Sequence, residues 1–182
     1  MVFYLVRHAH AEWSPDENRP LSARGLQDSL AVADLLDSFS VHRVISSPYQ
    51  RAVQTVEPFA KRKGLEIKKC VAFRERILGL YSDTTFSEAV RRTWEDPNFA
   101  YRHGETNREA QSRGVNGIRE LLDEEMEGSI VVGTHGNLLA LILNHYDQSL
   151  GYSFWVRLTM PDIYRLEVGK SGKTQIQRIW NG

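Results

Sequence analysis

Two histidines and an arginine lie close together near the start of the chain, after a short apolar run. The stretch LVRHAHAEW places Arg7 directly before His8 and puts His10 two positions further on. An imidazole can act as a nucleophile or ligate a metal, and a guanidinium grips phosphate or carboxylate oxygens. The spacing therefore suits either a metal site made by both histidines or one nucleophilic histidine beside an arginine clamp.

Residues of the same chemical types follow two further apolar runs. Arg51 comes shortly after HRVISS, and His135 directly follows SIVVGT. In an open α/β sheet the carboxyl ends of parallel strands share one edge, where ligands bind. We therefore expect Arg7, His8, Arg51 and His135 to face one pocket, with helix N-termini adding N–H groups that favour anions. Guanidinium groups bind phosphoryl oxygens and an imidazole can attack phosphorus, so this group indicates phosphoryl chemistry.

Breaking a phosphate ester also requires a group that gives a proton to the leaving alkoxide, and a carboxyl group can do this. Glu75 in FRERILG is the better candidate because it follows an expected strand and has arginines and apolar residues as neighbours. Glu105 in RHGET is the second candidate. Residue types and spacing leave the choice between them open.

The elements that must position these residues alternate between strands and helices. Compact apolar runs are typical of buried strands, and apolar residues at helical spacing follow most of them. The expected strands cover residues 2–7, 42–47, 65–71 and 129–134; the expected helices cover 21–39, 47–64, 84–96, 106–128 and 136–146; and a hairpin is expected from 152–160 and 162–172. This order indicates an α/β fold with a mostly parallel central sheet and helices on both faces.

Local signals mark where some of these helices begin. Ser22 can cap the first helix, and Thr106 with Glu109 forms a T-x-x-E capping box for the long one. Apolar spacing in the first helix places Leu26, Leu30, Ala33 and Leu36 on one face.

Length, composition and charge exclude several classes of protein. The 182 residues suit one domain, residues 1–182, in which the segment at 76–104 is rich in ionisable and aromatic groups, as a lid or substrate segment would be. Lysine plus arginine and aspartate plus glutamate number 23 each, which argues against nucleic acid or an anionic membrane as a partner. No run approaches the roughly 20 apolar residues of a membrane span. Cys70 is the only cysteine, which excludes an internal disulfide and fits a cytoplasmic protein.

Six blocks of the sequence, in order, resemble characteristic segments of the histidine phosphatase superfamily, the group that includes cofactor-dependent phosphoglycerate mutase. The first block, LVRHAHAEW, is similar to the family's R-H-G motif. The others are RPLSARG for P-L-T-x-x-G, VISSPYQRAVQT for S-S-P-x-x-R-A-x-x-T, FRERILG for E-x-x-x-G, HGETNREAQSRG for G-E-S and its helix, and VVGTHGNLL for S-H-G-G. They span almost the whole chain, so the resemblance implies a phosphoglycerate mutase-like fold.

The resemblance also implies a role for each matching residue. His8 would be the nucleophile and become phosphohistidine, although the sequence does not indicate which nitrogen attacks. Glu75 would protonate the leaving group and then deprotonate the attacking water. The residues expected to bind phosphoryl oxygens are Arg7, Arg51 and His135. The candidate substrate-binding residues are Ser14 and Glu105. The family needs no metal, and no cofactor is expected.

Three residues depart from the family's pattern. Ala9 replaces the usual glycine, which bears on how closely the backbone can approach phosphate. His10 stands where many members have a carboxylate, and Ser14 stands where many have an asparagine.

Several functions remain open. The short first loop and the lack of a longer substrate block favour a metal-independent phosphatase for a small phosphorylated metabolite over a 2,3-bisphosphoglycerate-dependent phosphoglycerate mutase. A phosphatase of phosphohistidine or phosphoproteins, and a non-catalytic phosphoprotein-binding module on the same fold, are further alternatives. A metal-dependent hydrolase using His8 and His10 is disfavoured because zinc sites take three or more ligands and the other histidines are scattered. Monomer and homodimer are both compatible with the sequence.

Overall fold

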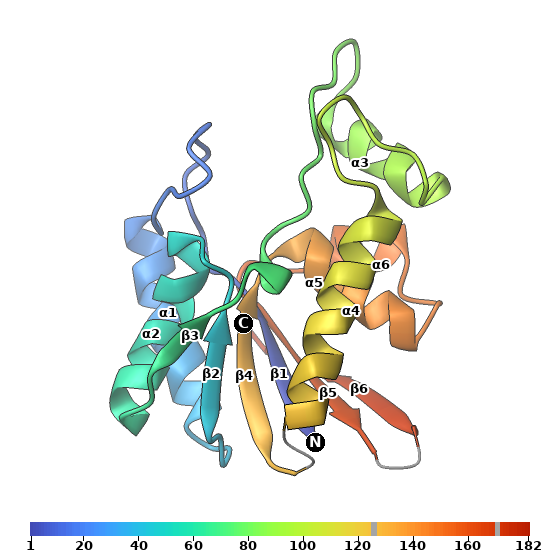
Figure 1. Cartoon of the computed structure of the whole chain (residues 1–182). Coiled ribbons are helices and arrows are strands. Elements are labelled where there is room, and N and C mark those ends of the chain that lie inside the picture. Colours follow the sequence, from blue (N-terminus) through green and yellow to red (C-terminus); the bar gives the residue numbers. More distant parts are fainter. Residues whose placement is uncertain (125–126, 170–171) are drawn as a thin grey trace.

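A central six-stranded sheet organises the chain, of which the computed structural model describes residues 1–124, 127–169 and 172–182. The strands are β1 (Val2–Arg7), β2 (Arg43–Ser46), β3 (Ile67–Lys69), β4 (Ser129–Thr134), β5 (Asp162–Val168) and β6 (Thr174–Arg178). They lie in the order β3-β2-β4-β1-β5-β6 (Figure 1). The first four pair in parallel, and β5 and β6 are added antiparallel, which confirms the expected mostly parallel α/β sheet.

Helices cover both faces of this sheet, as expected. They are α1 (Ala23–Leu36), α2 (Gln50–Lys63), α3 (Phe86–Glu95), α4 (Asn107–Glu124), α5 (Gly136–Tyr146) and α6 (Tyr152–Arg157), with a short 3-10 turn at Val71–Phe73. One buried cluster joins α1 and α2 to the sheet through residues such as Val32 and Phe59, and includes Val6 of β1. The other joins α4, α5 and α6 to the opposite face and includes Leu5. Neighbouring residues of β1 thus enter opposite clusters, as strand alternation requires.

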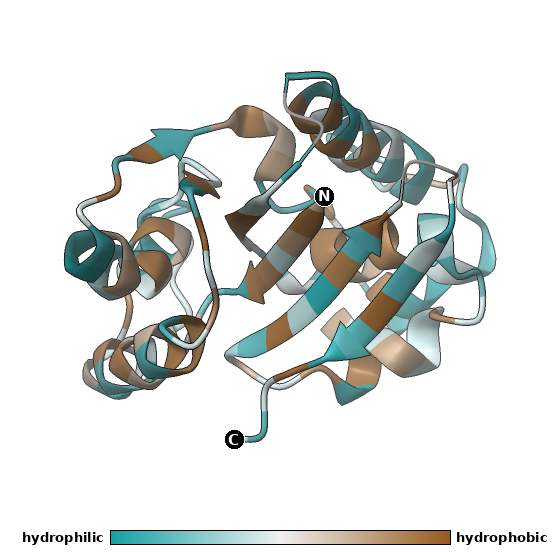
Figure 2. Ribbon diagram, turned by 90° about the horizontal axis from the view of Figure 1, so that it is seen from below, coloured by the Kyte–Doolittle hydropathy of each residue, from teal (hydrophilic) through white to brown (hydrophobic). Residues whose placement is uncertain are grey.

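Hydropathy follows the same arrangement. Figure 2 shows β5 and β6 alternating between apolar and polar residues, whereas β4, which lies inside the sheet, is buried along its whole length. The edge pair has one face on the core and one toward solvent, so alternation is expected there. Within residues 1–124, 127–169 and 172–182, none of the helices has the length and apolar character needed to cross a membrane.

Both expected helix caps are confirmed. The Ser22 hydroxyl accepts a hydrogen bond from Gly25 N at the start of α1. Before α4, Glu109 N donates to Thr106 Oγ1 at 3.0 Å, and Thr106 N donates to a Glu109 carboxylate oxygen at 2.9 Å. Each cap satisfies backbone N–H groups that have no partner within the helix.

The expected apolar face of α1 is confirmed for Ala33 and Leu36, which are fully buried, and wrong for Leu26 and Leu30. Leu26 and Leu30 are 45% and 43% exposed, while the helix packs inward through Gly25, Ser29 and neighbouring small or apolar residues. A Cβ at Gly25 would lie 2.0 Å from His10 O, so the chain leaving β1 passes directly against this helix. Because the backbone of His10 lies so close, the side of α1 that faces it carries small residues. Leu26 and Leu30 lie on the side of the helix that faces solvent.

The expected first strand of the terminal hairpin is also wrong. Residues Tyr152–Arg157 form helix α6, and the hairpin instead joins β5 to β6. Phe154 and Leu158 are four residues apart and both buried, which is the spacing of one helical face.

Residues 77–105 leave the body of the molecule and return to it on two paired legs. Leu80 N donates to Arg102 O at 2.9 Å, and Glu105 N donates to Ile77 O at 2.8 Å. Helix α3 lies between the two legs in the sequence, and in space it stands away from the sheet (Figure 1). The expected lid or substrate segment at residues 76–104 is this excursion, and its role stays a prediction.

Two glycines allow the legs to pair so closely. A Cβ at Gly104 would lie 2.5 Å from Leu78 O, and one at Gly79 would lie 2.7 Å from Gly104 N. Gly79 also has a φ of +88°, which other residues rarely adopt. The glycines of the E-x-x-x-G and G-E-S blocks are therefore in close contact where the two legs leave the body of the molecule.

Candidate active site

The parallel pairing of β1 with β4 brings the two candidate histidines side by side. His8 N donates to Thr134 O at 3.0 Å, one residue before His135. The imidazole rings of His8 and His135 lie edge to face with their centroids 5.1 Å apart. Strand β2 follows on the other side of β4, and Arg51 in the first turn of α2 reaches the same edge of the sheet.

The hydrogen bonds of His8 determine which ring nitrogen carries the proton. His8 Nδ1 lies 2.7 Å from Ala9 O, and a carbonyl oxygen can only accept, so Nδ1 is the protonated nitrogen. His8 Nε2 accepts from Arg51 Nε at 3.2 Å and carries the lone pair. Burial, and then the positive charge of Arg51, lower the pKa of His8 to about 3. The ring is therefore neutral at physiological pH, with Nε2 as its nucleophilic atom.

A threonine of the S-S-P-x-x-R-A-x-x-T block fixes the backbone beside His8. Ala9 N donates to Thr55 Oγ1 at 2.9 Å, and Thr55 Oγ1 donates to Arg51 O at 2.7 Å. Ala9 is fully buried, and its φ is not among the positive values found for described non-glycine residues. The alanine that replaces the family's glycine is thus accommodated without backbone strain.

His135 is completely buried at this edge. Its exposed fraction is zero, and its Nε2 lies 2.8 Å from Ser47 Oγ. Its Nδ1 is buried without a hydrogen-bond partner. Burial first, and then His8 and the nearby arginines, hold the pKa of His135 well below its usual value. Sequence reasoning missed Ser47 as a site residue, although it is the second serine of the S-S-P block.

Arg7, the last residue of β1, lies at the same edge of the sheet. Its Nη1 donates to Leu158 O at 2.9 Å and to Thr159 O at 3.2 Å, while its buried Nε has no partner. A Cβ at Gly136 would lie 2.9 Å from Arg7 Cζ. The glycine after His135 is therefore required by the space that this guanidinium occupies.

Arg51 holds the first loop as well as His8. It is 4% exposed, and its Nη1 donates to Glu17 O at 2.6 Å. The Tyr49 hydroxyl donates to a Glu17 carboxylate oxygen at 3.0 Å, and Gln50 N donates to Asn18 Oδ1 at 3.0 Å. The loop after β1 is thereby fastened across the first turn of α2.

That loop carries a further cation that sequence reasoning missed. Arg19 Nη1 donates to Ser14 O and to Asp16 O, and its buried Nε has no partner. The charge of Arg19 contributes to lowering the pKa values of His8 and His135. Its position in the RPLSARG block was the available signal. The Ser14 hydroxyl accepts from Asp16 N within the same loop.

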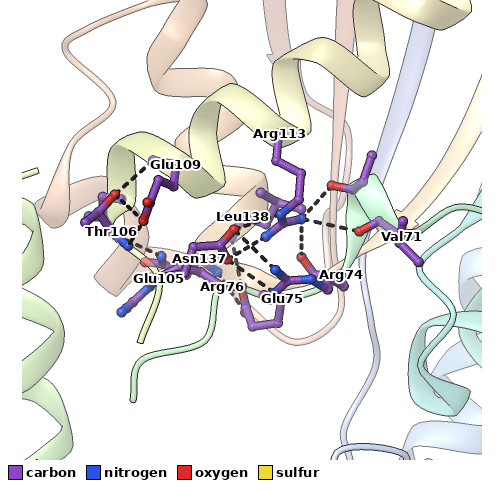
Figure 3. Close-up of polar contacts among 12 residues, drawn as sticks. Val71, Arg74, Glu75, Arg76, Glu105, Thr106, Glu109, Arg113, Asn137 and Leu138 are labelled. Atoms are coloured by element: carbon purple, nitrogen blue, oxygen red, sulfur yellow. Dashed lines mark hydrogen bonds and ion pairs between the residues drawn. The ribbon is translucent and has the colours of Figure 1, made fainter. Parts of the chain in front are cut away.

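Glu75 lies on the N-terminus of the helix that follows His135. One carboxylate oxygen, Oε1, accepts from Arg76 N at 2.8 Å and from Leu138 N at 3.0 Å, while Oε2 accepts from Asn137 N at 3.1 Å (Figure 3). Asn137 and Leu138 belong to the first turn of α5, whose free N–H groups and dipole favour a negative charge. The same turn therefore positions both His135 and Glu75.

Glu105 occupies a different environment. Its oxygens pair with Arg113 at 2.8 and 2.9 Å and with Arg74 at 3.2 and 3.3 Å (Figure 3). Burial alone raises the pKa of Glu105, but the hydrogen bonds and charges of Arg113 and Arg74 outweigh it, so the pKa lies below its usual value. A carboxylate held ionised by two arginines is a poor proton donor, which disfavours Glu105 for that task.

The two histidines of the H-x-H stretch point to different partners. His10 Nδ1 lies 2.8 Å from Ser22 Oγ at the start of α1, whereas both His8 nitrogens are engaged elsewhere. Among the residues that the structure describes, no three histidine, cysteine, aspartate or glutamate side chains are grouped in a way that could hold a metal ion.

Known proteins share this fold along its whole length. A mycobacterial glucosyl-3-phosphoglycerate phosphatase has 20% identity and a TM-score of 0.79, covering 100% of this chain and 98% of its own. A phosphoserine phosphatase mutant from Entamoeba histolytica has 18% identity and a TM-score of 0.79, covering 97% and 94%.

Sequence comparisons point to the same group. An uncharacterized phosphatase of Bacillus subtilis is 25% identical over 145 residues, which cover 76% of this chain and 74% of its own. A probable phosphoglycerate mutase of Salmonella choleraesuis is 31% identical over 83 residues, but these span only 39% of that protein. The model of the histidine phosphatase superfamily (branch 1) matches residues 3–181. The chain therefore belongs to the histidine phosphatase superfamily.

Proposed function

We propose that the chain is a metal-independent phosphomonoesterase that acts through a phosphohistidine on a small phosphorylated metabolite. The observation that carries this proposal is the neutral His8 ring, whose Nε2 lone pair is turned away from Ala9 and lies beside Arg51 and His135. Such a nitrogen can attack phosphorus without first losing a proton, once the Arg51 N–H that it accepts turns to a phosphoryl oxygen.

In the first half-reaction His8 Nε2 forms a bond to phosphorus while the bond from phosphorus to the ester oxygen breaks. Glu75 donates its proton to that oxygen, so the product leaves as an alcohol. The guanidinium groups of Arg7 and Arg51 bind the phosphoryl oxygens and stabilise the charge of the transition state. A dianionic phosphoryl group beside His135 favours the protonated form of that imidazole.

In the second half-reaction a water molecule attacks the phosphohistidine. Glu75 now takes a proton from that water, the bond from phosphorus to nitrogen breaks, and inorganic phosphate leaves. His8 regains its neutral form with the proton on Nδ1, held by the Ala9 carbonyl. The roles of acid and base thus fall to one carboxyl group at one position.

The relatives support a small phosphorylated metabolite as the substrate class. The structural neighbours with named activities are phosphatases of small phosphorylated compounds. The likeness to phosphoglycerate mutases covers less than half of those proteins. These observations support hydrolysis over transfer of the phosphoryl group back to substrate.

Trapping the intermediate tests the proposal. Purified protein in EDTA should release inorganic phosphate from phosphomonoesters, and rapid quenching with a labelled substrate should yield a label that is stable to alkali and labile to acid. The label should disappear in His8→Ala and persist in His10→Ala. Label that survives in His8→Ala, or activity lost in EDTA and restored by zinc, would refute the mechanism. Conversion of 3-phosphoglycerate to its 2-isomer in the presence of bisphosphate primer would indicate a mutase instead.

A further inference from the structure

The C-terminal end of lid helix α3 is fastened by two buried carboxamides. Trp94 Nε1 donates to Asn137 Oδ1 at 3.1 Å, and Asn107 Nδ2 donates to Thr93 O at 2.9 Å. The two carboxamides contact each other, since Asn137 Nδ2 lies 3.4 Å from Asn107 Oδ1. Asn107 and Asn137 are 2% and 5% exposed, so the contacts of Asn107 with Thr93 and Asn137 are buried, and Trp94 reaches Asn137 from a half-buried position. Trp94 and Thr93 thus connect α3 to the first residues of α4 and α5.

The same asparagine holds the candidate proton donor. Asn137 accepts from Trp94 with its side chain and donates from its backbone N–H to Glu75 Oε2 at 3.1 Å. Two backbone N–H groups, those of Arg76 and Leu138, donate to Glu75 Oε1, whereas the N–H of Asn137 donates to Oε2. Asn137 N thus fixes the rotation of the carboxylate that brings Oε2 into place, and Oε2 retains a lone pair that can carry a proton.

We propose that Trp94 is a positioning residue for Glu75, acting through Asn137, so that the seating of α3 sets the placement of the proton-donating oxygen. This inference rests on the proposed role of Glu75 as proton donor. The indole ring packs against the core beside α5, and its N–H supplies the polar tie. The segment 77–105 is then connected to Glu75 in two ways. It follows Glu75 closely along the chain, and its Trp94 is hydrogen-bonded to Asn137, whose N–H donates to Glu75.

The dependence of rate on the leaving group distinguishes positioning from general damage. An alkyl phosphate requires a proton on its departing oxygen, whereas p-nitrophenolate departs without one. The first half-reaction is followed by rapid mixing, as the rate of phosphoenzyme formation from each ester. With Trp94→Phe, which keeps an aromatic ring but removes the N–H, the alkyl phosphate rate should fall about tenfold and the p-nitrophenyl phosphate rate by less than about twofold.

A second tryptophan provides a matched control. Trp155 lies on α6 and packs against Phe86 at the start of α3, with ring centroids 6.2 Å apart. It takes no part in the hydrogen bonds that join Trp94, Asn137 and Asn107. Trp155→Phe should leave the ratio of the two rates unchanged. Asn137→Leu removes the carboxamide but keeps the backbone N–H, so it should reproduce the effect of Trp94→Phe. The double variant should show no further loss, because both changes break the same contact.

The Glu75→Gln variant separates failure of this inference from failure of the proposed function. If Glu75 is the proton donor, Glu75→Gln loses phosphoenzyme formation from the alkyl ester and keeps it from the p-nitrophenyl ester. Should Glu75→Gln affect both esters equally, the proposed role of Glu75 is wrong. If Glu75→Gln shows the selective loss while Trp94→Phe and Asn137→Leu slow both esters equally, or neither, Trp94 is not a positioning residue.

Discussion

At the scale of single residues, His8 and Arg7 show how neighbouring backbone decides what a side chain can do. The Ala9 carbonyl selects the tautomer of His8, and Thr55 fixes that segment of backbone through Ala9 N. Arg7 is held by the carbonyls of residues 158 and 159, and its guanidinium lies in the space that Gly136 leaves free. The positions of both groups thus depend on residues that do no chemistry themselves.

Gly136→Ala tests the space around Arg7. The new methyl group would lie 2.9 Å from Arg7 Cζ, so the guanidinium must move away from the phosphoryl position. Misplacing a charge-stabilising donor typically costs about a hundredfold in rate. We expect kcat/KM for phosphomonoester hydrolysis to fall by about this factor, with the chain still folded.

Gly151→Ala is the matched control for that variant. A Cβ at Gly151 meets no atom within 4 Å, and its φ of −92° is negative, so the substitution places no residue in the left-handed region. Its kcat/KM should remain at the unsubstituted level. Equal activity of the Gly136 and Gly151 variants would contradict the proposed position of Arg7 during the reaction.

At the scale of elements, two parts hold Glu75 in the site. One is the first turn of α5, and the other is the base of the lid segment, where residues 77–80 pair with residues 102–105. The first turn of α5 supplies two N–H donors to Glu75 and follows directly after His135. The lid segment begins immediately after Glu75 and is closed at its base by the contact of Gly79 with Gly104. Any change that opens this base acts on the segment that carries Glu75.

Gly104→Ala should open the base of the lid segment. The added Cβ would lie 2.5 Å from Leu78 O, a backbone atom that cannot move aside without separating the legs. Overpacking of this kind costs about 1–3 kcal/mol. We expect faster hydrogen exchange and faster proteolysis within residues 80–102, together with lower activity on alkyl phosphates.

The strands of the sheet serve as the internal reference for the Gly104→Ala experiment. Exchange of amides in β1 and β4 should be unchanged, since these strands pair with each other inside the central sheet. Loss of protection that is uniform over the sheet and the lid segment would show that the substitution destabilises the whole fold instead.

At the scale of the whole molecule, the site gathers positive and titratable groups that the fold keeps away from water. His8 is 8% exposed and His135 is fully buried, and arginines surround both rings. The chain as a whole has equal numbers of acidic and basic residues, 23 of each. The positive character of the site is therefore local, produced by three strand ends and one loop.

These buried histidines predict a stability that declines in acid. The pKa of His8 is lowered from 6.5 to about 3 in the folded chain, mainly by burial. Between these two values the unfolded chain binds more protons than the folded chain, so the free energy of unfolding decreases as the pH falls from 6.5 toward 3. Each such histidine contributes a slope of up to about 1.4 kcal/mol per pH unit. Urea denaturation between pH 7.5 and 4.5 measures it.

The variant His8→Asn isolates the contribution of His8 from that of other titrating groups. Its free energy of unfolding should depend less steeply on pH than that of the unsubstituted chain, by about one proton over the same range. Parallel curves for the two proteins would show that His8 is not held neutral by the fold.

The sequence by itself determined the features that depend on local spacing. Ser22 and the pair Thr106 and Glu109 mark helix starts because a cap involves only residues within one turn. The apolar runs followed by His8 and by His135 predicted strand ends at one edge, and their parallel pairing places the two rings 5.1 Å apart. The α/β architecture follows from the same alternation of elements.

Only the tertiary structure decided matters that depend on residues far apart in the chain. Leu26 is exposed because the chain near His10 crosses α1, and residues 152–157 are helical because Phe154 and Leu158 are buried on one side. Glu75 and Glu105 are both glutamates in loops, but one meets the N–H groups of a helix and the other meets two arginines. Environment, which the fold creates through such long-range contacts, separates the two carboxylates.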